Sequence, residues 1–164
     1  MYQQEDRVAV RAEARKRRLV TLLPGALLWA IGVAVFILCQ IRRQDWGWIF
    51  ACGCTITGGA YVVFLHGVYL RPVLTYQRHV DYMLDGRKRE TVGILQEIAR
   101  EVTDRDGLDW YAMTVNVGDR NDPEDERLFY LDALKPWPEI PPGTRVRVLS
   151  NDKSVAELRA VEIK

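Results

Sequence analysis

The chain has 164 residues, of which 48% are hydrophobic and 27% charged, and its formal net charge is only +1. That average conceals two opposite ends: residues 1–18 carry six basic against three acidic side chains, whereas residues 90–164 carry ten against sixteen. All three cysteines lie in stretches without charge, so the composition excludes a small extracellular module held together by disulfides.

Residues 1–18 form a basic extension of helix-forming composition. The stretch EDRVAVRAEARKRR contains neither Pro nor Gly, and we expect it to continue into the next segment as one cytoplasmic helix. Its positive charge favours a topogenic role, since basic flanks stay on the cytoplasmic side of a membrane. A patch that binds anionic lipid is the alternative interpretation.

Residues 19–41 predict a first transmembrane helix. These 23 residues contain no charge, and thirteen of them are Leu, Ile, Val or Phe. About 20 apolar residues suffice to cross the hydrocarbon core of a bilayer. A cleaved signal peptide is the alternative, but the stretch exceeds the usual apolar region of about 7–15 residues and no small-x-small cleavage pattern follows. We therefore interpret it as an uncleaved helix.

Residues 46–70 predict a second transmembrane helix, which pairs with the first as a hairpin. This uncharged run contains nine Leu, Ile, Val or Phe and five glycines, and residues 42–45 can only reverse the chain at a membrane surface. Aromatic side chains favour headgroup depth, so the membrane-interface residues should be Trp46, Trp48, Tyr69, Arg42 and Arg43.

Basic flanks predict the orientation of this hairpin. The N-terminal flank and residues 71–89 together contain eleven Lys and Arg, against two in the turn. The positive-inside rule then places both termini in the cytoplasm and residues 42–45 outside.

Small residues recur at every fourth position in both predicted helices, as Ala26, Ala30 and Ala34 in the first and as Gly47, Ala51, Thr55 and Gly59 in the second. Such spacing lets helix backbones approach closely in lipid. We expect these residues to pack the two helices of the hairpin together, with an oligomer interface as the second possibility.

Residues 71–89 predict an amphipathic linker helix. Val73, Tyr76, Val80, Met83 and Leu84 fall near one helical face. Asp85-Gly86 is a typical stop signal.

Beyond residue 90 the hydrophobic period changes from 3.6 to 2, which predicts a β domain over residues 90–164. Val92, Ile94, Gln96, Ile98 and Val102 fall on one side of the first strand, with Gly93 at a bulge, and DRDG (104–107) is typical of a hairpin turn. Five short strands in about 75 residues favour a small closed barrel of OB or SH3-like type. The strands are expected at 91–103, 110–117, 127–133, 144–150 and 155–163.

Two transmembrane helices followed by a barrel that ends in PPGTRVRVLSNDKSVAELRAVEI resemble the NfeD-like membrane proteins and other small bacterial membrane proteins with a C-terminal barrel. In those families the final strands often follow a Gly-x-x-Val-x-Val pattern, here Gly143, Val146 and Val148. The resemblance implies a cytoplasmic OB-type module with a scaffolding role at the inner membrane.

The barrel offers candidate binding residues but little material for catalysis. Its net charge of −6 argues against nucleic acid. The motifs of nucleotide binding, metal ligation and nucleophilic catalysis do not occur, so we expect no enzyme activity, no cofactor, no metal and no small-molecule substrate. The aromatic residues that could bind a protein partner are Trp110, Tyr111, Phe129, Tyr130 and Trp137.

Two features remain open from the sequence. His66 is an ionisable residue near the cytoplasmic end of the second helix, where such residues are candidates for function. The acidic stretch 119–126 favours a solvated hairpin tip, with a calcium site or a partner-docking loop as alternatives.

The sequence therefore predicts an α+β membrane protein of the bacterial inner membrane, a scaffold or assembly subunit that contacts lipid and either itself or another membrane subunit. The alternative is a homo-oligomeric channel formed by the hairpin, with the barrel as a cytoplasmic collar.

Overall fold

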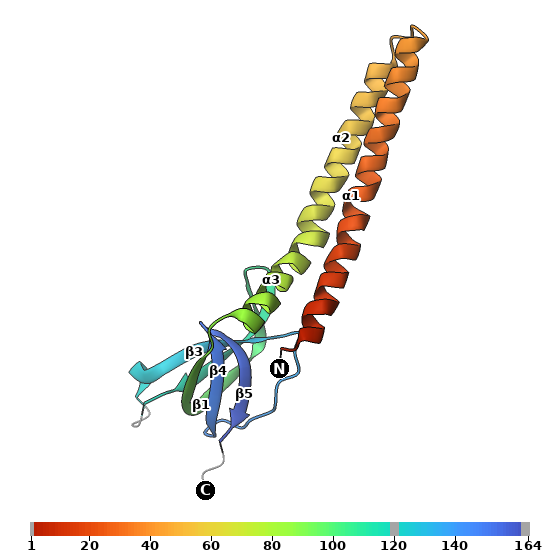
Figure 1. The fold of residues 1–164 in the computed structure, drawn as a ribbon. Helices are drawn as coiled ribbons and strands as arrows, with labels where there is room; N and C mark the ends of the chain where they lie inside the picture. The colour runs from red at the N-terminus through yellow and green to blue at the C-terminus, as the bar shows by residue number, and fades with distance from the viewer. Residues whose placement is uncertain (1, 119–121, 162–164) are drawn as a thin grey trace. The chain divides into compact units, whose positions relative to one another are not determined.

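The computed structural model describes residues 2–118 and 122–161. Four helical segments come first, and a five-stranded sheet follows (Figure 1). This confirms the predicted order of two long apolar helices and then five strands. The helices are α1 (Gln4–Ile41), α2 (Gly47–Leu65), the π-helix η1 (His66–Leu70), α3 (Arg71–Asp85) and the short 3-10 helix η2 (Pro123–Asp125), and the strands are β1 (Arg89–Arg105), β2 (Leu108–Asn116), β3 (Glu126–Asp132), β4 (Arg145–Asn151) and β5 (Ser154–Ala160).

The chain divides into two compact units. One comprises residues 8–77, and the other joins residues 1–7 to residues 78–164. From the sequence we expect a cytoplasmic extension (1–18), a linker (71–89) and a barrel (90–164) as separate parts. In the structure the start of α1 and the end of α3 belong to the unit that contains the sheet.

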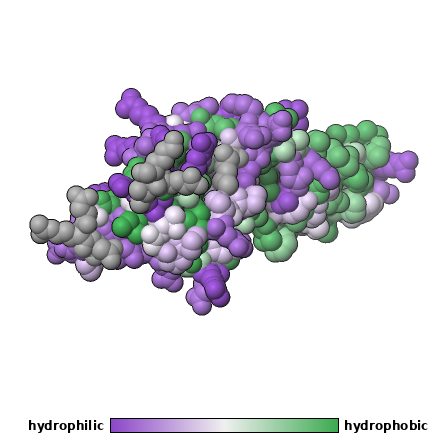
Figure 2. All heavy atoms as spheres, turned by 90° about the horizontal axis from the view of Figure 1, so that it is seen from below, coloured by the Kyte–Doolittle hydropathy of each residue, from purple (hydrophilic) through white to green (hydrophobic). Residues whose placement is uncertain are grey.

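The first unit, residues 8–77, is a helical hairpin. Both of its helices are long and apolar enough to cross a membrane. Apolar residues gather on one side of the view in Figure 2, and large side chains of the hairpin such as Val63 and Ile56 are 74% and 71% exposed.

Two prolines lie within the helices α1 and α3. Pro24 lies inside α1, which continues through it. Pro72 lies in α3 directly after η1, where the backbone N–H of Arg71 bonds to the carbonyl of His66. A proline ring clashes with the carbonyl four residues earlier, and the wider turn of η1 accommodates Pro72 without ending the helix. Residues 71–85 therefore continue the preceding helix.

The second unit is built around a sheet in which every strand has two hydrogen-bonded neighbours. The order is β1-β2-β3-β5-β4, and β4 pairs back with β1, so the strands form a closed barrel. All pairs are antiparallel except β3 and β5, which meet in parallel at Tyr130 and Ser154. Because β1 has 17 residues, it borders β2 along one part and β4 along another.

The inward face of β1 differs from the expected one. Gly93 and Leu95 are buried, whereas Val92 and Val102 are 38% and 50% exposed. The backbones of β1 and β2 approach each other closely at Gly93, because a Cβ atom there would lie 2.3 Å from the carbonyl oxygen of Asn116. Irregularities at Leu95/Glu97 and at Ile98/Val102 then shift the register, so one alternation does not hold along the strand.

The barrel core is formed by apolar side chains from all five strands. Met113 and Val115 of β2 are fully buried. The buried cluster consists of Leu95, Met113, Val115, Phe129, Leu131, Val146, Val148, Val155 and Leu158.

Candidate functional site

The N-terminal segment is anchored in the sheet-containing unit by a buried polar cluster, formed by Tyr2, His79 of α3 and Asp132 of β3. The Tyr2 hydroxyl donates a hydrogen bond to Asp132 Oδ2 at 2.9 Å, and its oxygen lies 3.0 Å from His79 Nε2. A hydroxyl has one proton to donate, and Asp132 accepts it. His79 must therefore donate its Nε2–H to the Tyr2 oxygen.

Both ends of this cluster are fixed by further contacts. Asp132 is 2% exposed and accepts a hydrogen bond from the Leu134 backbone N–H, while its carbonyl accepts one from the Trp137 indole N–H at 2.7 Å. The His79 ring packs edge-on against Trp110, with centroids 4.8 Å apart. Burial lowers the pKa of His79, and the Asp132 carboxylate opposes that shift only in part. The imidazole is therefore neutral at neutral pH, and the cluster serves to dock Tyr2.

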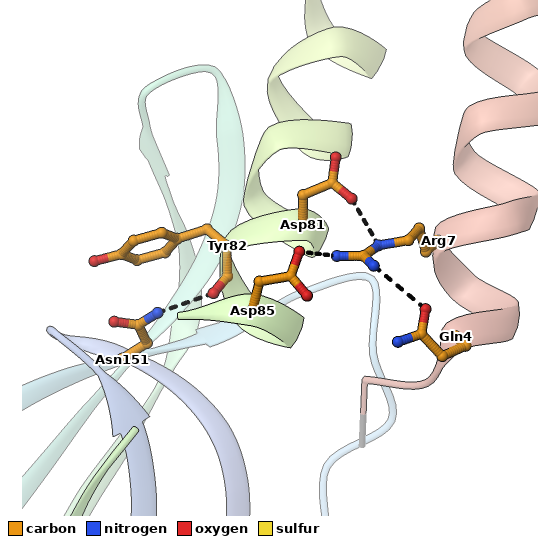
Figure 3. A network of polar contacts seen from close by, with 6 residues as sticks. All are labelled: Gln4, Arg7, Asp81, Tyr82, Asp85 and Asn151. Carbon is orange, nitrogen blue, oxygen red and sulfur yellow. Dashed lines mark hydrogen bonds and ion pairs between the residues drawn. The ribbon is translucent and has the colours of Figure 1, made fainter. Parts of the chain in front are cut away.

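Ion pairs reinforce this docking at the start of α1 (Figure 3). Arg7 pairs with Asp81 at 2.8 Å and also with Asp85, both near the end of α3. Lys135 Nζ lies 2.5 Å from Asp6 Oδ1. Desolvation raises the pKa of Asp6, but the hydrogen bond from Lys135 outweighs it together with smaller contributions, so the net shift is downward. Sequence reasoning assigned these N-terminal residues only to a basic extension.

The candidate partner-binding aromatics fall into two groups. Phe129 is in the barrel core, and Trp110 is 5% exposed beneath His79. Tyr130 is half-buried, with the Trp110 ring at its edge and the Arg105 guanidinium over its face at 4.7 Å. These three rings are engaged by the chain itself.

The remaining two, Tyr111 and Trp137, line one groove of about 680 Å³ on the barrel. Its wall is mainly apolar, with ionisable side chains also present. The stretch KPWPEIPPG (135–143) connects β3 to β4, and apart from Trp137 its contribution to this groove was not predicted from the sequence. A cluster of prolines beside a tryptophan was the available signal. The lining residues are Ile98, Arg100, Tyr111, Leu131, Lys135, Trp137, Pro138, Glu139, Ile140 and Pro141.

A second groove, of about 690 Å³, is polar. Its basic residues are Arg87, Arg89, Arg127 and Lys153, but Glu124, Glu126 and Asp152 line the same groove. Mixed charge of this kind gives no preference for an anionic ligand.

The helices of the hairpin contact each other through small residues, although largely not those expected. On α1 the buried positions include Gly25, Gly32 and Cys39, which recur every seven residues. On α2 they face Gly58, Ala51 with Cys54, and Gly47, respectively. A seven-residue period keeps one seam between two helices, whereas a strict four-residue period drifts around the helix.

Most of the predicted packing residues therefore lie away from this seam. Ala26, Ala30 and Ala34 are exposed, since Ala26 lies one position beyond Gly25 and the other two lie two positions from Gly32, and Thr55 and Gly59 are exposed too. Gly47 and Ala51 do lie in the contact.

A hydrogen bond crosses the hairpin where Pro24 interrupts the backbone pattern of α1. Pro24 has no N–H to donate to the carbonyl of Val20. The Tyr61 hydroxyl of α2 donates to that carbonyl at 3.1 Å. The side chain thus replaces the missing backbone donor.

The predicted membrane-interface residues lie at both ends of the hairpin. At the turn, Trp46 and Trp48 are 51% and 58% exposed, and Arg42 and Arg43 are exposed as well. At the other end Tyr69 is half-buried: its carbonyl accepts a hydrogen bond from Arg17 Nη1 at 3.1 Å, and the Arg17 guanidinium lies 4.5 Å from its ring centroid.

Neither His66 nor the described part of the acidic stretch 119–126 forms a metal site. Within residues 2–118 and 122–161, no group of three or more His, Cys, Asp or Glu could hold a metal ion. His66 is exposed in η1. In the acidic stretch Asp122 Oδ1 accepts the Glu124 N–H and caps η2, while Asp119 lies outside the described residues.

Comparison with protein-family models, curated proteins and solved structures found no match for this chain.

Proposed function

We propose that this chain is a non-enzymatic scaffold or assembly subunit, anchored in the bacterial inner membrane by its hairpin, which presents a cytoplasmic barrel to a protein partner. The partner is either a second copy or another membrane subunit. The observation that carries the proposal is a hairpin with an apolar surface in the same chain as a barrel whose partly buried Tyr111 and Trp137 line a mainly apolar groove.

Exposed apolar side chains support lipid as the solvent of the hairpin. Only 17% of the most apolar 18-residue stretch of α1 is buried. In the helix that runs from Gly47 to Asp85, only 6% of the corresponding stretch is buried. Exposing such an apolar surface to water costs a free energy of about 25 cal/mol per Å². The 23 uncharged residues from Leu19 to Ile41 extend about 34 Å as a helix, which matches a hydrocarbon core of about 30 Å.

The strand order supports a barrel of OB type. A long first strand that borders both β2 and β4, with closure between β3 and β5, fits the five-stranded Greek-key barrel of that class. The same features agree with the resemblance to NfeD-like proteins. The basic flanks of the hairpin support cytoplasmic termini.

The groove supports a protein partner. Protein interfaces are enriched in Tyr and Trp and depleted of charge at their centre, and Tyr111 and Trp137 lie beside Ile98, Leu131 and Ile140. The buried Tyr2–His79–Asp132 cluster is committed to docking the N-terminal segment, which leaves the groove as the better candidate surface.

The test is the particle size of the full chain, extracted from its native membrane in mild detergent and separated by native electrophoresis. Ile140→Glu places a charge in the groove. Leu134→Glu is the matched control, because Leu134 lies in the same connection, is 68% exposed and does not line the groove. We expect a particle larger than the monomer that shrinks with Ile140→Glu only. A monomeric wild type, or equal effects of the two substitutions, would refute the proposal.

The second candidate function is a channel formed by symmetric association of hairpins. It is favoured by small residues of α2 that face away from α1. A Cβ atom built on Gly53 or Gly59 would have no described atom of another helix within 4 Å, so a second hairpin could pack there. Close packing of small residues drives helix association in lipid. Planar-bilayer recordings of the purified chain test it, and silence under both voltage and tension would remove it.

A further inference from the structure

Four exposed basic side chains gather at one end of the hairpin. Arg15, Lys16 and Arg18 come from α1, and Arg71 comes from the first residue of α3. We call these four residues the cationic belt. All of them belong to the compact unit of residues 8–77.

The hydrogen bond from Arg17 to the Tyr69 carbonyl places the belt residues at similar levels along the hairpin. Gly25 packs against Gly58 and Val62, and counting back along each helix from that contact also puts residue 17 close to the level of residue 69, since a helix rises about 1.5 Å per residue. Measured along the hairpin from the level of residues 17 and 69, Arg18 lies about 1.5 Å nearer to the turn. Arg15 and Arg71 each lie about 3 Å farther from the turn than that level. The four cations thus occupy a band of roughly 5 Å, about one helical turn.

The acidic residue nearest to the belt in the sequence is directed to a different partner. Residues 8–77 contain only Glu13 and Asp45 as acids, and Asp45 lies in the turn at the far end. Glu13 Oε1 accepts a hydrogen bond from Arg17 Nε at 2.7 Å, and chiefly for that reason its pKa is lowered. Glu13 is therefore bound to Arg17, which packs against Tyr69, and it attracts Lys16 of the belt only as a weaker contribution. The four belt cations outnumber this one carboxylate, so the belt stays positively charged.

The belt borders the apolar surface directly. Leu19, the next residue after Arg18, is 61% exposed, and Leu22 and Leu23 are 51% and 56% exposed. If the hairpin inserts as proposed, the belt lies at the depth of the headgroup phosphates, where clustered Lys and Arg favour anionic lipids. Guanidinium groups suit phosphate particularly, because their planar N–H pairs match its oxygens.

We propose that the cationic belt binds the headgroup phosphates of anionic phospholipids in the cytoplasmic leaflet, so that the hairpin carries an annulus enriched in these lipids. The inference rests on the proposed membrane insertion and adds lipid selectivity to it. A purely topogenic charge would direct insertion and then show no preference among lipids.

The experiment measures the association of spin-labelled phosphatidylglycerol and phosphatidylcholine with the full chain reconstituted in vesicles that contain both lipids. The test variant carries Arg15→Gln, Lys16→Gln, Arg18→Gln and Arg71→Gln. The matched control carries Arg42→Gln and Arg43→Gln at the opposite end of the hairpin. One cation near an anionic surface contributes about a fivefold preference at most, and salt screens part of it.

We expect the wild type and the control to restrict the anionic label severalfold more than the zwitterionic one, and the belt variant to restrict both equally. No preference in the wild type, or an unchanged preference in the belt variant, would overturn the proposal. A preference that inorganic phosphate removes, but chloride of equal ionic strength does not, would overturn it in favour of a free-phosphate site.

Resistance to an alkaline carbonate wash is measured on the same vesicles. If the protein resists the wash but shows no lipid preference, only the proposal for the cationic belt is wrong. Protein that washes off contradicts both the belt and the membrane anchor.

Discussion

Replacing Tyr61 with Phe should destabilise the hairpin, because it removes the donor that Pro24 fails to provide to the Val20 carbonyl. Hydrogen bonds between transmembrane helices contribute about 0.6 kcal/mol on average and up to about 1.7 kcal/mol. An unsatisfied backbone group in hydrocarbon costs several kcal/mol. Since the proline removes the alternative donor, we expect a loss near the upper end of the measured range, about 1.5 kcal/mol.

The assay is the free energy of separating the two helices, measured by steric trapping in bicelles with one biotin tag on each helix. A double-mutant cycle with Pro24→Ala isolates the cause. Alanine restores a backbone N–H to α1, so Tyr61→Phe should then cost less than about 0.5 kcal/mol, as expected for a surplus hydrogen bond. An equal loss in both backgrounds, or no loss in the wild-type background, would refute the reasoning.

Three further predictions concern other buried positions. Thr21→Val should stabilise the hairpin by about 1 kcal/mol in the same assay, because the buried Thr21 hydroxyl has no hydrogen-bond partner within the described chain. Gly32→Leu should separate the helices and Gly53→Leu should not, since a Cβ at Gly32 would lie 2.9 Å from Cys54 Cβ while that of Gly53 meets open space; equal stabilities would contradict the observed seam. Burial lowers the pKa of His79 below its ordinary 6.5, so the unfolded chain takes up the proton first as the pH falls. The melting temperature of the sheet-containing unit should therefore be highest above pH 6.5 and fall through the folded pKa, and His79→Gln should flatten that decline.

Hydrogen bonds and ring contacts between distant residues explain why the N-terminal docking was not predicted. Tyr2 and Asp132 are 130 positions apart, and Tyr2 and His79 are 77 apart. No local pattern marks such a pair, because a tyrosine that precedes a helix and a histidine inside one are equally compatible with exposed positions. Only the closed barrel and the end of α3 create the buried site that Tyr2 enters.

Contact between the hairpin helices shows a different limit of sequence reasoning. Small residues correctly indicated close packing, but Gly25, Gly32 and Cys39 form the seam and Ala26, Ala30 and Ala34 do not. A shift of one residue turns a helix by about 100°. The choice among neighbouring small residues depends on the facing helix, where Gly58, Ala51 and Gly47 complete the contact.

By itself the sequence determined what depends on neighbours along the chain. Two uncharged runs required long helices, and the change to a period of two required strands, because hydropathy and backbone preference act over a few residues. The tertiary structure alone decided the register of β1, where the approach of Asn116 to Gly93 selects the inward face. It also decided which aromatics remain available, since Trp110 is covered by His79 while Tyr111 and Trp137 share a groove. These outcomes follow from contacts between distant segments, which exist only once the chain has folded.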